Sequence, residues 1–202
     1  MATTANVGRP PATTRAELGA TALELFAAKG FDATSVDDVA AATGLARRTL
    51  FRYFPSKNAM VWGDFEDHLD FMRRALRNQP PDTPLGESLR RALIAFNDVP
   101  PEYRDQHRTR MTLVLRVPTL QAYSMLMFGE WRQVVAEHVA ARLGVQPGEH
   151  LPQSIGWQLL GVALAAYEKW VADPEEDLLG LLDAGCTVLV DGLAAVEPAF
   201  AE

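Results

Sequence analysis

The stretch from Gly44 to Lys57 constrains the fold of this chain more strongly than any other. It opens with a glycine, the residue that best tolerates the left-handed backbone of a sharp turn between helices. A short helix carrying three arginines follows, and its aromatic end leads into a proline, a serine and a lysine. A short basic helix behind a tight turn suits the major groove of DNA. We therefore interpret this stretch as the second half of a helix-turn-helix motif.

The residues before Gly44 predict the first helix of the same motif. Ser35 can cap a helix over 36–43, and the acidic residues that follow it favour the positive end of that helix. Ala40 is small, which lets two helices approach closely at the turn. An ordinary helical hairpin would fit this alanine and the glycine equally well. The arginines of the second helix favour DNA binding instead.

A further helix is expected ahead of this pair. Thr14 can cap it, apolar residues repeat at helical spacing from Leu18 to Phe26, and Gly30 can end it. The region before residue 57 is therefore predicted to be a three-helix domain.

Residues 1–13 are predicted to form a flexible basic arm. They contain Gly8-Arg9-Pro10-Pro11, a stiff extended sequence with one arginine. Arg9 would suit the narrow, negative minor groove of DNA. A plain disordered tail explains the same residues, so both interpretations stay open.

The region 14–57 resembles the DNA-binding domain of the TetR family of bacterial regulators. The resemblance lies in the pattern Gly-Phe-x-x-Thr-Ser-Val-x-x-Val-Ala-x-x-x-Gly, then an arginine-rich helix, then Tyr-Phe-x-Ser-Lys. Within that family, Ser56-Lys-Asn-Ala, Trp62-Gly-Asp-Phe and Gly161-Val-Ala-Leu-Ala-Ala-Tyr-Glu-Lys-Trp are similar to regulators associated with mycofactocin gene clusters in actinobacteria. The resemblance implies a DNA-binding transcriptional regulator, usually a repressor, of mycofactocin-related genes. Ala46 departs from the family pattern, because the recognition helix usually opens on serine or threonine.

DNA contacts are expected along the motif. Arginines pair well with guanine edges, and a helix N-terminus can hold a phosphate. The resemblance adds phosphate contacts from Tyr53 and Lys57. The expected DNA-binding residues are Arg9, Thr34, Ser35, Arg47, Arg48, Thr49, Arg52, Tyr53 and Lys57.

A net charge of −7 first argues against DNA as a partner. Residues 1–57, however, carry seven basic and five acidic residues, a net +2, while the remainder carries twelve basic and twenty-one acidic residues, a net −9. Attraction to phosphates depends on the field at the contact surface, which salt screens beyond about 10 Å. The charge distribution is therefore compatible with a DNA-binding N-terminal domain.

Beyond residue 57 the sequence predicts helices only, with no alternating strand pattern and no internal repeat. Ser56 can cap a long connecting helix that we expect to reach Asn78. Proline- and glycine-rich separators divide the rest. The expected helices cover 85–98, 102–116, 119–143, 153–172 and 175–196. The prediction is an all-α fold in which 14–57 is the helix-turn-helix domain and 58–202 is a helical bundle for ligand binding and dimerisation.

The last two helices carry apolar stripes that include small residues. Burial within one chain explains such stripes, and so does a subunit interface. The resemblance implies a four-helix homodimer interface, and two heads about 34–36 Å apart would read a near-palindromic operator. The expected interface residues are Leu160, Gly161, Leu164, Leu178, Leu182, Gly185, Leu189 and Gly192.

A small-molecule effector is expected to bind between the head and the dimer helices. Aromatic residues and methionines there suit an apolar ligand, although they suit an ordinary core equally well. Arg104, His107 and Arg108 share a helix face and could hold an anion, although a solvated face paired with acidic neighbours explains them too. We expect an apolar-tailed anion, best matched by a long-chain acyl-CoA, which would release the DNA by shifting the connecting helix. The expected ligand residues are Phe96, Arg104, His107, Arg108, Met111, Leu115, Tyr123, Met127, Trp131, Trp157 and Tyr167.

Catalysis is not expected. The four histidines are scattered, no metal-binding spacing or phosphate loop occurs, and the single cysteine cannot form an intrachain disulfide. We therefore predict no catalytic residue, no metal and no cofactor. The start of the chain lacks a secretory signal pattern, so a cytoplasmic, nucleoid-associated protein without membrane contact is expected. A helical adaptor acting through protein contacts, or an activator in place of a repressor, remains the alternative.

Overall fold

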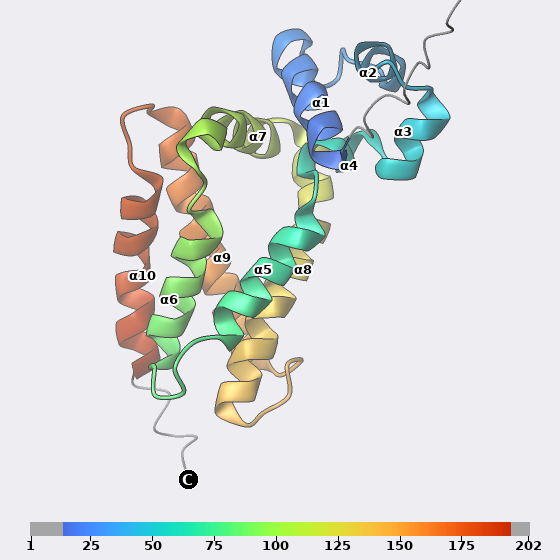
Figure 1. Ribbon diagram of the computed structural model, residues 1–202. Helices are drawn as coiled ribbons and strands as arrows, with labels where there is room; N and C mark the ends of the chain where they lie inside the picture. The colour runs from blue at the N-terminus through green and yellow to red at the C-terminus, as the bar shows by residue number, and fades with distance from the viewer. Residues whose placement is uncertain (1–13, 195–202) are drawn as a thin grey trace, which may run out of the picture. The chain divides into compact units, whose positions relative to one another are not determined.

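The computed structural model describes residues 14–194, which form ten α-helices and one short 3₁₀ helix (Figure 1). No strand occurs among these residues, so the predicted all-α fold is confirmed. The chain divides into two compact units, a head that ends at Gly63 and a body that begins at Asp64.

The head contains α1 (Arg15–Lys29), α2 (Val36–Thr43), α3 (Arg47–Tyr53) and α4 (Lys57–Trp62). Its helix ends follow the local rules of capping. Thr14 and Ser35 each accept a backbone N–H at the start of α1 and α2, and a side chain in the first turn bonds back to each cap. Gly44 ends α2 in the left-handed conformation, with φ of 67°. The caps at Thr14 and Ser35 and the left-handed Gly44 were predicted from the sequence, and the reciprocal bonds from the first turns were not.

The predicted long connecting helix from Ser56 to Asn78 is wrong. Ser56 does cap a helix, but that helix ends at Trp62, and α5 (Phe65–Arg77) begins after a break. The break lies at Gly63, whose φ of 58° and ψ of −129° are incompatible with a continuous α-helix. Because glycine has no Cβ, it adopts this conformation without the steric cost that other residues would incur. The head therefore includes α4, and the body starts with α5.

The body comprises α5 to α10. The helices after α5 are α6 (Leu85–Asn97), α7 (Arg104–Arg116, preceded by the 3₁₀ turn Pro101–Tyr103), α8 (Pro118–Leu143), α9 (His150–Ala172) and α10 (Leu178–Ala194). The long helices α6, α8, α9 and α10 run side by side with α5, and α7 lies across one end of them (Figure 1). These bounds lie within a few residues of those predicted from the sequence.

A polar pair, the buried Ser88 and the half-buried His138, links α6 to α8. The hydroxyl of Ser88 donates to the carbonyl of Leu85 at 3.1 Å, so it accepts from Nε2 of His138 at 2.8 Å. Burial, assisted by the neighbouring Arg142, lowers the pKa of His138 to about 4. The imidazole is therefore neutral at pH 7 and acts as a structural hydrogen-bond donor.

Helices α6 and α10 approach each other closely at Gly86 in α6. A Cβ at this position would lie 2.8 Å from Cα of Val190 and 3.1 Å from its carbonyl oxygen, both in the backbone of α10. We predict that Gly86→Ala lowers the free energy of unfolding by about 1–3 kcal/mol, because a backbone cannot yield as a side chain can. Chemical denaturation measures this change.

Gly129→Ala is the matched control for this prediction. Its added Cβ would meet only a side-chain nitrogen of Arg132, at 3.9 Å. In a helix interior that substitution should raise stability by about 0.5–1 kcal/mol. Equal effects of the two substitutions would contradict the close helix contact at Gly86.

Candidate nucleic-acid interface and regulatory region

Helix α3 exposes its basic side and buries its apolar side. Leu50 is fully buried, while Arg47, Arg48 and Arg52 are exposed and Thr49 is half-buried. Ala46 stands at the N-cap and makes no side-chain hydrogen bond, so the cap that the family pattern supplies is missing here. The arrangement can place guanidinium groups against a nucleic acid while the apolar side anchors the helix.

The three arginines of α3 have different surroundings. Arg47 forms an ion pair with Asp37 of α2, with 3.0 Å between Nη1 and Oδ2, and its guanidinium also lies over the ring of Phe51. Arg52 lies over the ring of Tyr53, 5.5 Å from the ring centroid. Within the described part of the chain, Arg48 has no hydrogen bond, ion pair or ring contact. Arg48 therefore carries the most available charge of the helix.

Thr34 and Ser35 occupy structural positions at the start of α2. Thr34 is only 1% exposed, and its hydroxyl donates to the carbonyl of Gly30 at 2.8 Å. A side chain that points into the core cannot hold a phosphate, which corrects the expectation for Thr34. Ser35 is exposed, but its hydroxyl and its backbone N–H both donate to the Asp38 carboxylate, and these hydrogen bonds lower the pKa of that carboxyl.

Lys57 stabilises the head through its contacts with Phe31. Its ammonium donates to the carbonyl of Phe31 and lies 4.1 Å from the centroid of the ring of the same residue. Burial lowers the pKa of Lys57, with Asp32 opposing the shift. Tyr53 is half-buried beside Arg52. The expected DNA contact from Arg9 lies outside the described residues.

Several predicted ligand residues meet inside the body. The rings of Phe96 and Trp131 lie 6.3 Å apart, and those of His107 and Tyr167 lie 5.5 Å apart. Met111 is buried as well. The remaining apolar candidates Leu115, Tyr123 and Met127 are half-buried. Trp157, by contrast, is 48% exposed and carries the guanidinium of Arg132 on its ring, so it does not belong to this interior.

A chain of hydrogen bonds crosses this interior. Tyr167 donates to the side-chain oxygen of Asn97 and lies 2.9 Å from Nε2 of His107. Burial, helped by the charge of Arg110, lowers the pKa of His107 to about 4, and burial raises that of Tyr167 above its usual range. His107 is therefore neutral at pH 7 and donates to Tyr167. Asn97 and Arg110 were missed as candidates, because nothing in the sequence indicates which polar residues of α6 and α7 turn inward.

The predicted cluster of Arg104, His107 and Arg108 does not form. Arg108 donates to the carbonyls of Trp170, Asp173 and Pro174 and stacks on the ring of Trp170, while Arg104 is exposed and donates to the carbonyl of Val99. Successive residues of an α-helix are rotated by about 100°, which is enough to direct His107 inward and Arg108 toward the end of α9. Arg108 is thus engaged by the protein itself.

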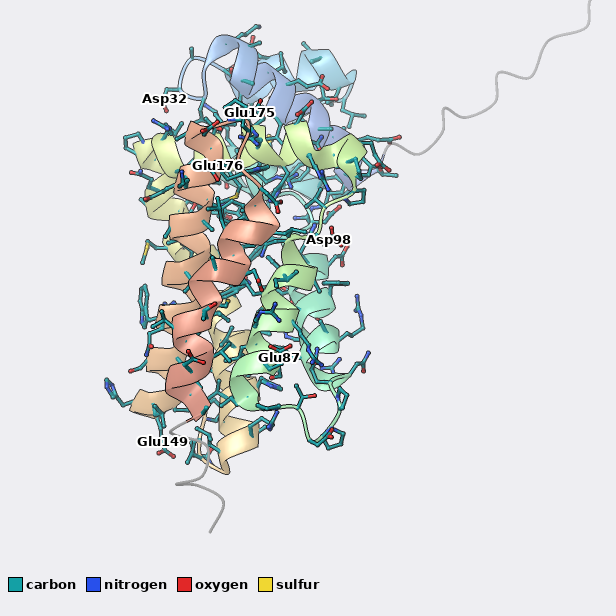
Figure 2. The ribbon with its side chains drawn as sticks, turned by 90° about the vertical axis from the view of Figure 1, so that its left-hand side faces the viewer. Asp32, Glu87, Asp98, Glu149, Glu175 and Glu176 are labelled. Atoms are coloured by element: carbon teal, nitrogen blue, oxygen red, sulfur yellow. The ribbon has the colours of Figure 1, made fainter. Side chains whose placement is uncertain are left out.

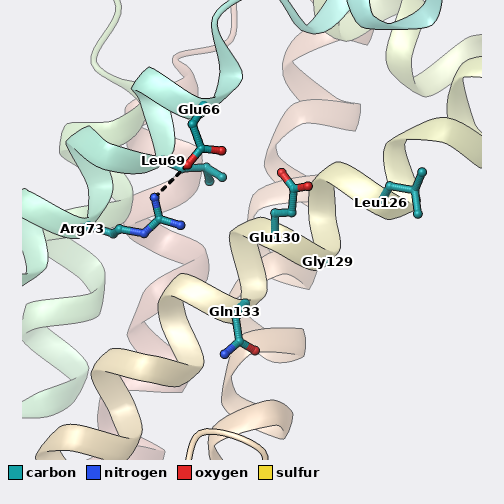
Figure 3. Close-up of a pocket in the computed structure, with 7 residues that line it drawn as sticks. All are labelled: Glu66, Leu69, Arg73, Leu126, Gly129, Glu130 and Gln133. Carbon is teal, nitrogen blue, oxygen red and sulfur yellow. Dashed lines mark hydrogen bonds and ion pairs between the residues drawn. The ribbon is translucent and has the colours of Figure 1, made fainter. Parts of the chain in front are cut away.

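A surface groove of about 540 Å³ lies between α5 and α8 (Figure 3). Arg73 forms an ion pair with Glu66 on the α5 side of the groove, with 3.1 Å between Nη1 and Oε1. None of the predicted ligand residues lines this groove, and its carboxylates disfavour an anion. The lining residues are Glu66, Leu69, Arg73, Leu126, Gly129, Glu130 and Gln133.

The stripes on α9 and α10 are only partly available to a partner. Leu160, Leu178, Leu182 and Leu189 are buried within the single chain, which corrects their expected place in an interface. Gly185 lies against Val162, where a Cβ would be 2.8 Å from Cγ1, so it also serves the contact between α9 and α10. Gly161 and Gly192 are exposed, and Leu164 is half-buried.

A different apolar face is exposed on these two helices. It contains Trp157, Gly161 and Ala165 on α9, and Ala184 and Val188 on α10. Val188 is 80% exposed. Gly161 of this face was among the predicted interface residues, whereas Trp157 and Val188 were not.

Acidic side chains occur at several levels of the body, and four of them lie in the loop between α9 and α10, namely Asp173, Glu175, Glu176 and Asp177. Glu87, Asp98, Glu149 and Glu175 lie at different levels of the body (Figure 2). Within residues 14–194, no group of three or more histidine, cysteine, aspartate and glutamate side chains could hold a metal ion. In the same range no helix is both long and apolar enough to cross a membrane.

Comparison with known proteins identifies both units. The family model described as bacterial regulatory proteins of the tetR family matches residues 18–61, and that described as the MftR C-terminal domain matches residues 83–194. MftR of Mycobacterium tuberculosis (strain ATCC 25618 / H37Rv), whose name assigns it to the transcriptional regulation of mycofactocin biosynthesis, is 47% identical over 187 residues. That match covers 93% of this chain and 94% of the relative.

Solved structures share the fold. FadR from Bacillus subtilis in complex with stearoyl-CoA matches with a TM-score of 0.65 at 16% identity, over 89% of this chain and 99% of that one. FadR from Thermus thermophilus in complex with lauroyl-CoA matches with a TM-score of 0.59 at 22% identity, over 89% and 94%. Both family models and the extended identity to MftR lead to one conclusion: the chain belongs to the TetR family of bacterial transcriptional regulators, which bind DNA and are not enzymes.

Proposed function

We propose that this protein is a ligand-responsive repressor of mycofactocin-related genes. It binds a near-palindromic operator as a homodimer and is released by a long-chain acyl-CoA. The observation that carries the DNA-binding part is the exposed basic side of α3, anchored by the buried Leu50. The identity to MftR supports the choice of genes.

Base reading is assigned to the exposed residues of α3. Within the described residues the guanidinium of Arg48 has no hydrogen bond, ion pair or ring contact. An arginine in this state can donate two hydrogen bonds to O6 and N7 of a guanine. Arg47 and Thr49 lie beside it, and Arg52 can reach bases or backbone at the end of the helix. Tyr53 and Ser35 are the proposed phosphate contacts. Lys57 supports the head from inside, so its contribution to DNA affinity is indirect.

The effector is assigned to the aromatic interior of the body. An acyl chain would lie among Phe96, Met111 and Trp131, which offer apolar contact surface. The neutral chain from His107 through Tyr167 to Asn97 would face the polar thioester end. The two FadR structures, solved with acyl-CoAs, support this class of ligand for the shared fold. Arg104, exposed at the start of α7, remains the proposed contact for a phosphate of the CoA.

Release of DNA requires that the effector bind one arrangement of the two heads better than the other. The head joins the body at Gly63, whose positive φ ends α4 and allows a change of backbone direction there. A ligand that shifts α5 would act on this junction. Gly63 thus replaces the continuous helix as the proposed point of transmission.

Dimerisation is assigned to the outer apolar face of α9 and α10. Exposed apolar residues such as Trp157 and Val188 are the kind that a subunit interface covers. Two recognition helices are also needed for tight binding, because one seven-residue helix reads few bases.

Arg48→Ala should weaken binding to the cognate duplex by about 1–3 kcal/mol and relax its sequence preference, because a base contact is lost. The cognate duplex is selected by the wild-type protein from a random 20-base-pair library, and a shuffled duplex serves as reference. Fluorescence anisotropy measures both affinities. Arg77→Ala, which removes an exposed arginine of the body, should change neither. Equal losses on both duplexes for Arg48→Ala would refute its base-reading role.

Acyl-CoAs should raise the melting temperature of the protein, and the rise should grow with chain length, because each buried CH₂ contributes about 0.8 kcal/mol. Differential scanning fluorimetry with C8 to C18 acyl-CoAs and free CoA measures the shifts. Phe96→Ala should reduce the shift, whereas Phe71→Ala, at a residue 42% exposed on α5, should leave it intact. No stabilisation at any length would reject this ligand class.

Val188→Asp should convert the dimer to monomers and reduce operator affinity at least tenfold, because it places a charge in an apolar interface. Sedimentation velocity measures the association state. Leu126→Asp introduces the same charge at a residue 63% exposed on α8, outside the proposed face, and should leave the dimer unchanged. A dimer that survives Val188→Asp would move the interface elsewhere.

A further inference from the structure

The recognition helix begins with charges that oppose its own dipole. Ala46 caps α3 without a side-chain hydrogen bond, and the first turn contains no acidic residue. Arg47 and Arg48 occupy its first two positions, at the positive end of the helix dipole. The helix therefore needs a negative group from elsewhere.

Asp37 of α2 supplies this negative group. Its Oδ2 lies 3.0 Å from Nη1 of Arg47 and accepts a hydrogen bond from it. The guanidinium of Arg47 also lies over the ring of Phe51, 5.6 Å from its centroid. Arg47 is thus held by a carboxylate and by an aromatic ring, whereas the neighbouring Arg48 is not held by any residue between 14 and 194.

We propose that Asp37 is a specificity-determining residue of DNA recognition. Asp37 holds Arg47 in position to read a base. By pairing with the Arg47 guanidinium, it also weakens the attraction of that guanidinium to the phosphates of non-cognate DNA. This inference rests on the proposed use of α3 as the base-reading helix.

The ion pair acts differently on the two kinds of DNA. Non-specific affinity comes from cations that displace counterions from phosphates, and a cation already paired with a carboxylate contributes less. In a cognate complex the held guanidinium loses less conformational freedom, and its other N–H groups can still bond to a guanine. Asp37 therefore lowers the affinity for random DNA more than the affinity for the cognate site.

The solvent exposure of the ion pair between Arg47 and Asp37 limits how much it changes the affinity for DNA. The side chains of Arg47 and Asp37 are 56% and 67% exposed, so solvent screens their attraction and a phosphate can compete for the arginine. The expected change is a few-fold difference in affinity and not a loss of binding. Phe51, 40% exposed, helps to keep Arg47 in place.

The test compares Asp37→Asn, Arg47→Ala and the double variant on a cognate duplex selected by the wild-type protein and on a shuffled duplex. Glu24→Gln is the matched control, because it removes one exposed carboxylate of the same head, on α1. Melting temperatures establish that each variant is folded; Asp37 is not part of the capping box of α2, which uses Ser35 and Asp38.

Asp37→Asn should raise the affinity for the shuffled duplex about three- to tenfold and change that for the cognate duplex less than about twofold. The salt dependence on the shuffled duplex should steepen by about 0.9 per head, the value for one additional phosphate contact. In the Arg47→Ala background, Asp37→Asn should raise the affinity for the shuffled duplex no more than Glu24→Gln does.

The inference is overturned if Asp37→Asn shifts both affinities equally, or if its effect persists without Arg47. The outcome is separable from the proposed function. A failure of Arg48→Ala to relax sequence preference would reject α3 as the reading helix. A normal Arg48→Ala result with no discrimination effect from Asp37→Asn would reject only the role of Asp37.

Discussion

The burial of Leu50 in the head is the contact on which the DNA-binding side of the molecule depends. Helix α3 has seven residues, and a helix of this length is unstable in water without tertiary packing. Its N-cap provides no side-chain bond, so the apolar contact of Leu50 and the buried Phe54 after the helix must hold it. Because the apolar side is fixed, the opposite side with its arginines faces outward. The basic surface is thus a consequence of core packing.

The charged residues of the chain are distributed unequally between the head and the body, and the excess of basic residues lies in the head. The region 1–57 has a net charge of +2 and the remainder −9. Attraction to phosphates depends on the charges near the contact surface, because salt screens charges farther away than about 10 Å, so an acidic total does not exclude a basic recognition surface. Within the recognition surface, the carboxylate of Asp37 pairs with Arg47, and we propose that this pair lowers the affinity for non-cognate DNA.

The sequence predicted those features that depend on residues close together in the chain. The caps at Thr14 and Ser35 and the turn at Gly44 follow from local hydrogen bonding and backbone sterics, and the structure confirms them. The break at Gly63 was missed, because a single glycine within helical spacing does not reveal whether its φ is positive. The all-α class was predictable because helical spacing repeats over many residues, whereas the predicted domain boundary after residue 57 differs from the division after Gly63 in the structure.

The regulatory residues were less predictable because their roles depend on contacts between distant helices. His107 and Arg108 are neighbours in sequence, yet one turns to Tyr167 and the other to carbonyls at the end of α9. The leucines of α10 form a true apolar stripe, but only the packing of α10 on α6 and α9 shows that they are inside the chain. Amphipathic spacing identifies a buried face without identifying what covers it.

Helix α7 links the proposed effector site to the proposed dimer helices. His107 contributes to the interior polar chain, and one residue later Arg108 donates to the carbonyls of Asp173 and Pro174, just beyond α9. A cation at the negative end of α9 is favoured by the helix dipole, and stacking on Trp170 restricts it further. A ligand that displaces α7 must therefore either carry the end of α9 with it or break these bonds. Since α9 also bears Trp157 of the outer apolar face, a displacement of α7 that moves α9 would couple the proposed effector site to the proposed subunit contact.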